Sequence, residues 1–206
     1  MIGVVNYGLG NIQAILNIYK NLNIPAFSIS NVQDFDKVNR IILPGVGAFD
    51  CAMEKLNRSC LRDRLDELVI QKNIPILGIC VGMQMMAERS EEGQMDGLSW
   101  IQGDVKHLRH NIKFDNNIMD VPHMGWNDIN IINKHPLFRG LDKKSFFYFL
   151  HSYFFSGKNK KQILTSTDYH GRFTSSFQNN NIYGVQFHPE KSHKWGIRLL
   201  HNFALI

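Results

Sequence analysis

Short apolar runs alternate with longer segments of helical periodicity through the first half of the chain. The apolar runs predict strands over residues 2–6, 26–30, 38–43 and 74–79. Apolar side chains recur every three or four positions over residues 11–21, and again from 49 to about 70 in one or two pieces, which predicts helices. This order of elements is typical of a mostly parallel sheet with helices on both faces.

The second half of the chain is richer in strand patterns. Strands are predicted over residues 100–108, 118–122, 128–131, 146–153, 162–167, 173–178 and 182–187, and a last helix over 194–203. We therefore predict an α/β fold whose mostly parallel central sheet, flanked by helices, is joined by an additional antiparallel β region. No repeat or low-complexity linker interrupts residues 1–206, which predicts a single domain.

Composition and charge argue against several classes of function. The chain has 206 residues, 44% of them hydrophobic, and its three cysteines lack the paired spacing of a zinc site or a disulfide framework, so no metal or cofactor is expected. The formal charge of +5 comes from scattered Lys and Arg, which argues against nucleic acid as a partner. No signal-like segment follows the start, and no apolar run approaches the roughly 18 residues that span a bilayer. These features predict a cytoplasmic protein with no membrane partner.

The candidate chemistry centres on Cys80. The strand predicted over residues 74–79 runs into the sequence Gly-Ile-Cys-Val-Gly at 78–82, and a helix is predicted over residues 83–89. Glycines two positions either side of a corner residue let a strand and a helix approach closely, as in a nucleophile elbow. A thiol at the start of a helix favours its thiolate form. The alternative is that Cys80 is a small buried apolar residue at the end of a core strand.

A candidate base, His188, and a candidate acid, Glu190, follow the last predicted strand. His188 leaves that strand where Pro189 stops it, and Glu190 lies near enough to orient the imidazole. In an open parallel sheet, reactive groups gather at the carboxyl ends of strands, where Cys80 also lies. A thiol needs an imidazole to take its proton and return it to the leaving group. A purely structural role for His188 is the alternative.

A glycine-rich turn, Leu-Pro-Gly-Val-Gly at residues 43–47, ends the third predicted strand. Such a turn can direct backbone N–H groups at the thiol, and the Val81 N–H at the helix start can supply a second donor. An ordinary turn explains the same residues.

The sequence Tyr-Gly-Leu-Gly-Asn at residues 7–11 is better explained as a tight turn and helix cap than as a dinucleotide site. The third glycine of that fingerprint would fall at Gln13, and no acidic residue ends the second strand.

The chain resembles the class I, or triad-type, glutamine amidotransferases. The resemblance rests on Gly-Ile-Cys-Val-Gly-Met-Gln at 78–84 and Phe-His-Pro-Glu at 187–190. Within that class it is similar to the glutaminase subunits of imidazole glycerol phosphate synthases, from the first strand to the final helix. That similarity is carried by residues 7–11, 43–49, 121–127 (Val-Pro-His-Met-Gly-Trp-Asn), 151–153 and 188–192.

The resemblance implies a flavodoxin-like fold and a role for each matching residue. Cys80 would be the nucleophile, His188 the general base and acid, and Glu190 the residue that orients it. The remaining positions would form the oxyanion segment (Gly45, Val46, Val81), the glutamine site (Gln84, Glu92, Ser152, Tyr153) and the ammonia exit facing a partner (Met124, Trp126, Asn127, Tyr148).

The implied activity is hydrolysis of glutamine to glutamate and ammonia. The ammonia would pass to a cyclase subunit with a (β/α)₈ barrel, which makes imidazole glycerol phosphate and an aminoimidazole carboxamide ribotide (AICAR) in histidine biosynthesis. Since ammonia is protonated in bulk water, the resemblance implies a heterodimer with a closed passage.

Some residues depart from the family pattern. Val81 stands where Leu is common, and Asp120 replaces a usual Lys. Three alternatives therefore stay open at this point: a paralogous subunit supplying ammonia for a surface-sugar amidation, a stand-alone thiol hydrolase or peptidase, and a subunit with a vestigial triad.

Overall fold

An eight-stranded sheet forms the centre of the molecule in the computed structural model, which describes residues 1–111, 120–142 and 144–206. Its strand order is β2-β1-β3-β4-β13-β12-β11-β8. Five neighbouring strands are parallel: β2 (Ala26–Ile29), β1 (Ile2–Val5), β3 (Arg40–Gly45), β4 (Ile76–Cys80) and β13 (Ile182–Val185). Three antiparallel strands extend it: β12 (Arg172–Asn179), β11 (Ile163–Asp168) and β8 (Asn130–Ile131).

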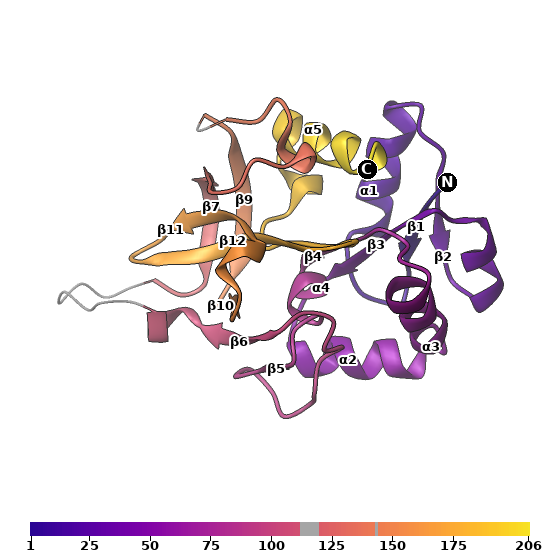
Figure 1. Cartoon of the computed structure of the whole chain (residues 1–206), viewed down its shortest axis with the longest axis horizontal. Coiled ribbons are helices and arrows are strands. Elements are labelled where there is room, and N and C mark those ends of the chain that lie inside the picture. The colour runs from indigo at the N-terminus through magenta and orange to yellow at the C-terminus, as the bar shows by residue number, and fades with distance from the viewer. Residues whose placement is uncertain (112–119, 143) are drawn as a thin grey trace.

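Helices cover both faces of the parallel part (Figure 1). On one face lie α1 (Ile12–Asn21) and α5 (His193–Ala204), and on the other α2 (Phe49–Arg58), α3 (Arg62–Asp66) and α4 (Val81–Gln84). Short 3-10 helices occupy Val32–Lys37, Leu108–Asn111, Pro136–Phe138, Lys160–Gln162 and Pro189–Lys191, and a π-helical turn occupies Glu67–Gln71. No helix in the described ranges is long and apolar enough to cross a membrane.

Two smaller sheets flank the antiparallel half. One joins β10 (Tyr153–Gly157), β6 (Gly103–His107) and β5 (Arg89–Ser90), and the other is the antiparallel pair of β7 (His123–Asp128) and β9 (Phe146–His151). The predicted fold class, a mostly parallel sheet flanked by helices with an additional antiparallel β region, is confirmed.

The helix predicted over residues 83–89 was wrong in its extent, because α4 ends at Gln84. The backbone beyond α4 pairs with a later loop instead: Leu98 N donates to Met85 O at 2.7 Å and Trp100 N to Met86 O at 2.9 Å. These carbonyls could not also accept hydrogen bonds from a continuing helix without sharing.

One predicted strand, over residues 146–153, is two strands in the structure. β9 pairs His151 with His123 of β7, and β10 pairs Tyr153 with His107 of β6, so the chain changes sheets at Ser152. Of the strand predicted over 118–122, residues 118 and 119 lie outside the described residues, and residues 120–122 are not a strand.

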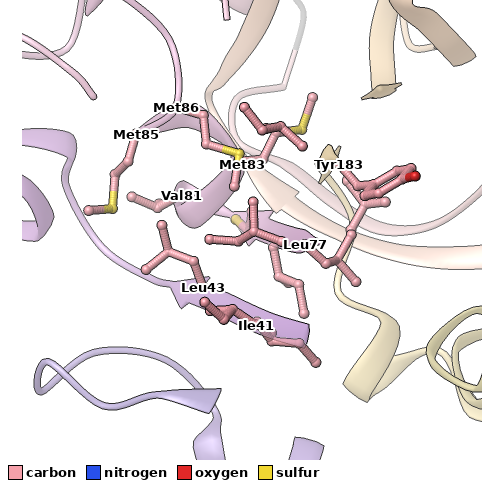
Figure 2. Packing of buried hydrophobic residues seen from close by; sticks show 14 of the residues in the cluster. Ile41, Leu43, Leu77, Val81, Met83, Met85, Met86 and Tyr183 are labelled. Carbon is pink, nitrogen blue, oxygen red and sulfur yellow. The ribbon is translucent and has the colours of Figure 1, made fainter. Parts of the chain in front are cut away.

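Part of the core lies where β3, β4 and the start of α4 meet. Every residue of β4 is buried, as expected of a parallel strand covered on both faces. Side chains such as Ile41, Leu43, Leu77 and Met83 gather there (Figure 2).

Glycines let the backbones of these elements touch. A Cβ on Gly82 would overlap the carbonyl oxygen of Leu43 in β3, and a Cβ on Gly78 would lie 2.7 Å from the Gly82 carbonyl oxygen. A side chain at either position would therefore push α4 away from the sheet.

We expect Gly82→Ala to lower the free energy of unfolding by about 3 kcal/mol, the upper end of the usual cost of overpacking, because the added methyl group meets backbone that cannot rotate away. Gly47→Ala is the control. Gly47 has φ +86° but no atom within 4 Å of its Cβ position, so only the left-handed backbone is penalised, by about 1–2 kcal/mol. Urea denaturation measures both variants, and equal losses would contradict the packing argument.

Candidate active site

The turn predicted at Cys80 is present, and its backbone is strained. Cys80 has φ 54° and ψ −113°, outside the favourable regions for a residue with a side chain. The residue ends β4 and immediately precedes α4, and only 3% of its surface is exposed. Its Sγ lies 3.8 Å from the Leu150 carbonyl oxygen and 3.8 Å from Gln186 Nε2. The thiol is thus held at the start of a helix and within reach of polar groups from β9 and from the segment that follows β13.

His188 is fixed through its backbone to β9. Its N–H donates to Tyr148 O at 2.8 Å, and its own carbonyl accepts from the Ser192 hydroxyl at 2.6 Å. The Ser192 oxygen in turn accepts from Tyr148 N at 3.0 Å. On the side chain, His188 Nδ1 lies 2.8 Å from Glu190 Oε1, and both side chains are almost fully buried. The imidazole therefore has a defined position and a defined partner at Nδ1.

The charges of the three side chains support one another. Burial opposes the charge on His188, but the Cys80 thiolate, hydrogen bonding to Cys80 and the contact with Glu190 outweigh it and raise the pKa of His188 to about 10. Burial likewise opposes the charge on Glu190, yet the hydrogen bonds from His188 and Asn11 keep the pKa of Glu190 below its usual value. The arrangement favours an imidazolium at His188 beside a carboxylate at Glu190.

A cavity of about 320 Å³ opens beside this group. Its lining includes eight residues that the sequence predicted for the site: Val46, Cys80, Val81, Gln84, Glu92, Ser152, Tyr153 and His188. Gly45 is buried beneath it, paired with Cys80 across β3 and β4, and a Cβ there would overlap the Gly82 nitrogen. Glu190 lies behind His188. Residues from five separated stretches of sequence therefore meet at one cavity.

Gln84 is held at the base of the cavity by its amide nitrogen. Nε2 donates to Tyr153 O at 2.8 Å and to Gln186 Oε1 at 3.0 Å. Gln186 comes two residues before His188 in the same buried stretch, so its side chain reaches both Gln84 and Cys80.

Glu92 brings a carboxylate to the cavity wall. One oxygen accepts from the Phe49 N–H at 2.9 Å, at the first residue of α2, where a negative charge is favourable. Burial raises the pKa of Glu92, opposed by this hydrogen bond and reinforced by the nearby Asp50 charge. A half-buried carboxylate in such a cavity suits a ligand with an amino group.

The residues predicted for an ammonia exit do not line this cavity. They belong to the β7–β9 pair, where alternate side chains face opposite ways. Met124 and Trp126 are exposed, at 65% and 47%, and Trp126 lies opposite Tyr148 with ring centroids 6.1 Å apart. Asn127 has its amide turned the other way, donating to Asp168 O at 3.0 Å.

Two histidines, given no role from the sequence, lie at the cavity: His151 is part of its lining, and His123 contacts His151. His151 Nδ1 donates to Tyr153 O at 2.8 Å, which leaves Nε2 to accept from His123 Nδ1 at 3.1 Å. Burial lowers the pKa of His151 to about 3 and that of His123 to about 4, so both are neutral. The pair fixes the Tyr153 carbonyl that also holds Gln84.

The sequence also predicted no role in the site for Tyr7, Asn11 or Gln186. Tyr7 donates its hydroxyl to Pro44 O at 2.8 Å, and Asn11 donates to Glu190 Oε1 at 2.7 Å. The only signal for Gln186 was a polar side chain within an otherwise apolar strand, two residues before His188.

Chemically, the site is equipped for acyl transfer. It combines a thiol beside an oriented imidazole with backbone N–H groups at the start of a helix. Within the described residues, no group of three or more His, Cys, Asp or Glu side chains could hold a metal ion.

Comparison with known proteins agrees with this chemistry. The family model of class I glutamine amidotransferases matches residues 4–206. A solved structure described as a glutamine amidotransferase superposes with a TM-score of 0.75 at 15% identity, covering 100% of this chain and 99% of its own, which supports the fold. The chain therefore belongs to the class I glutamine amidotransferases.

Relatives at higher identity define its place in that class. The imidazole glycerol phosphate synthase subunit HisH of Bdellovibrio bacteriovorus is 50% identical over 206 residues, covering all of both chains. The protein of the same name from Leptospira interrogans is 46% identical over 204 residues, covering 99% of each. Within the class, the chain is a member of the HisH family.

We expect Tyr7→Phe to lower the free energy of unfolding by about 1–3 kcal/mol, because the buried Pro44 carbonyl loses its donor. Tyr169→Phe is a matched control. Its hydroxyl also donates to a backbone carbonyl at 2.8 Å, that of Asp120, but at an exposed position where water can replace it. Thermal or urea unfolding should separate the two variants; a loss in Tyr169→Phe as large as in Tyr7→Phe would contradict the prediction.

Proposed function

We propose that this chain is the glutamine-hydrolysing subunit of an imidazole glycerol phosphate synthase, acting in histidine biosynthesis. The observation that carries the proposal is the cavity in which the Cys80 thiol meets His188, itself held by Glu190. Full-length similarity to HisH subunits supports the pathway and favours it over a stand-alone thiol hydrolase or peptidase.

In the proposed reaction, the Cys80 thiolate attacks the side-chain amide carbon of glutamine. The carbonyl oxygen becomes an oxyanion, stabilised by the N–H groups of Val46 and Val81. The C–N bond then breaks as His188 passes its proton to the departing nitrogen, which releases ammonia and leaves a thioester on Cys80.

Water completes the cycle. Once the sulfur is acylated, the thiolate charge that raises the pKa of His188 is gone, and burial favours the neutral imidazole. His188 can then take a proton from water, whose oxygen attacks the thioester. The C–S bond breaks, glutamate leaves, and the thiolate and imidazolium are restored.

Gln84, Glu92, Ser152 and Tyr153 would hold the glutamine. Glu92 is suited to the α-amino group, because its carboxylate lines the cavity and is only half-buried. The backbone at Ser152 joins β9 to β10, and its carbonyl accepts from Leu108 N at 2.9 Å, which fixes this wall.

The ammonia would pass to a cyclase subunit with a (β/α)₈ barrel, in a cytoplasmic heterodimer whose combined activities include a lyase step. The outer face of the β7–β9 pair suits this contact. It presents exposed apolar side chains at Met124, Trp126, Phe146 and Leu150. β9 also reaches the cavity, because Leu150 and His151 line it. Docking on this face would place the partner beside the thiol.

We expect Cys80→Ala to reduce glutamate formation from glutamine by at least about 10³-fold in the assembled synthase, since the nucleophile is lost. Synthesis driven by added ammonium salts should persist, because it bypasses the thiol. Cys51→Ala is the control, since Cys51 is exposed on α2. A Cys80→Ala enzyme that releases glutamate at the wild-type rate would exclude the mechanism.

Trp126→Ala should weaken binding of the cyclase subunit by about tenfold or more, because a large, half-exposed aromatic side chain is a typical interface anchor. Ile70→Ala, a truncation at a comparably exposed apolar residue in the π-helical turn, should leave binding unchanged. Titration by isothermal calorimetry measures both. Equal affinities of the two variants would place the partner on another surface.

A further inference from the structure

Asn11 stands at a position where asparagine normally caps a helix, but its side chain does not do so. It immediately precedes α1, and its carbonyl accepts the first helical hydrogen bond, from Ile15 N at 3.2 Å. Asn is among the best N-cap residues because its side-chain oxygen can accept from an N–H of the first turn. In the described part of the chain, no such side-chain bond is formed at Asn11.

The side-chain amide of Asn11 bonds to Glu190 instead of to the helix. Asn11 Nδ2 donates to Glu190 Oε1 at 2.7 Å, across 179 positions of sequence. The same oxygen contacts His188 Nδ1 at 2.8 Å. The other carboxylate oxygen, Oε2, is buried and has no hydrogen-bond partner among the described residues. Asn11 therefore supplies one of very few donors to a carboxylate that is almost fully removed from water.

The turn before Asn11 is built to hold it there. Gly8 and Gly10 have φ of +90° and +102°, conformations that glycine adopts without strain. A Cβ on Gly10 would lie 2.7 Å from Pro44 Cβ, so the loop packs directly on the end of β3. Tyr7 adds its hydrogen bond to the Pro44 carbonyl. The loop is thus anchored on one side to the predicted oxyanion segment and on the other to Glu190.

We propose that Asn11 is a positioning residue for catalysis, whose amide fixes Glu190 and through it the imidazole of His188. This inference rests on the proposed glutaminase function. Asn11 does not line the cavity, so it acts on the substrate only through these two side chains. Because the Asn11 side chain bonds to Glu190, α1 lacks a side-chain cap. A local loss of stability of this kind is typical of functional sites.

The hydrogen bond from Asn11 to Glu190 stabilises both the charge and the orientation of the Glu190 carboxylate. A buried carboxylate with one donor removed is less stable in its charged form, and it can rotate away from the imidazole. His188 would then be less well oriented toward Cys80, and its proton less well stabilised. Besides Glu190, Cys80 raises the pKa of His188, and His188 in turn helps to lower the pKa of the buried, neutral His151.

The test compares Asn11→Ser with Asn11→Ala in the assembled synthase. Serine can cap α1 but is too short to reach Glu190, whereas alanine can do neither. We expect kcat for glutamine hydrolysis to fall by about 10–100-fold in both variants, with little change in KM. Asn11→Ser should nevertheless unfold at higher urea concentration than Asn11→Ala. Activity would then follow the contact with Glu190 rather than the stability of the helix.

Asn31 provides a matched control within the chain. It caps the helix at Val32–Lys37 by accepting from Asp34 N at 3.2 Å, and it is not among the residues that line the cavity. Asn31→Ala should lower stability and Asn31→Ser largely preserve it, with wild-type kcat in both.

The outcomes of these experiments test the positioning role of Asn11 separately from the proposed glutaminase function. If Asn11→Ser retains wild-type kcat, Asn11 is a structural residue and the inference fails. If the wild-type synthase hydrolyses glutamine no faster than its Cys80→Ala variant, the proposed function itself fails, whatever the Asn11 variants do.

Discussion

The close approach of three backbone segments at the end of β4 is the constraint on which the site depends. Cys80 can take its strained conformation only because α4 begins directly against β3, with Gly82 facing the Leu43 carbonyl and Gly45 facing the Gly82 nitrogen. Strain at one residue persists when its surroundings leave no alternative, and here the surroundings are backbone. The same packing brings the predicted oxyanion segment within reach of the thiol.

β9 connects the remaining parts of the site. Its backbone holds His188 through Tyr148 and lies against the thiol at Leu150, and its last residue begins the wall that continues into β10. Its outward side chains form the apolar face assigned to the partner. β9 therefore contacts the nucleophile and the base and forms part of the proposed docking surface, so a small displacement of this strand would affect all three.

The parts of the site that depend on local sequence could be predicted. The glycines around Cys80 encode a tight turn, and Pro189 marks the strand end where His188 emerges. Contacts between distant residues could not be predicted from local rules. From the sequence alone, Asn11 is predicted to cap a helix. Its amide faces Glu190 because α1 packs beside the Pro189–Lys191 helix. The short α4 and the change of sheet at Ser152 likewise follow from pairing with remote segments.

The apolar outer face of the β7–β9 pair also has a consequence for the cell. A chain made without its partner leaves aromatic and aliphatic side chains of the β7–β9 pair in contact with water. Surplus copies would associate with one another or attract proteases and chaperones. Matched synthesis of the two subunits would avoid that waste, so selection on this protein should act on the ratio of its expression as well as on its chemistry.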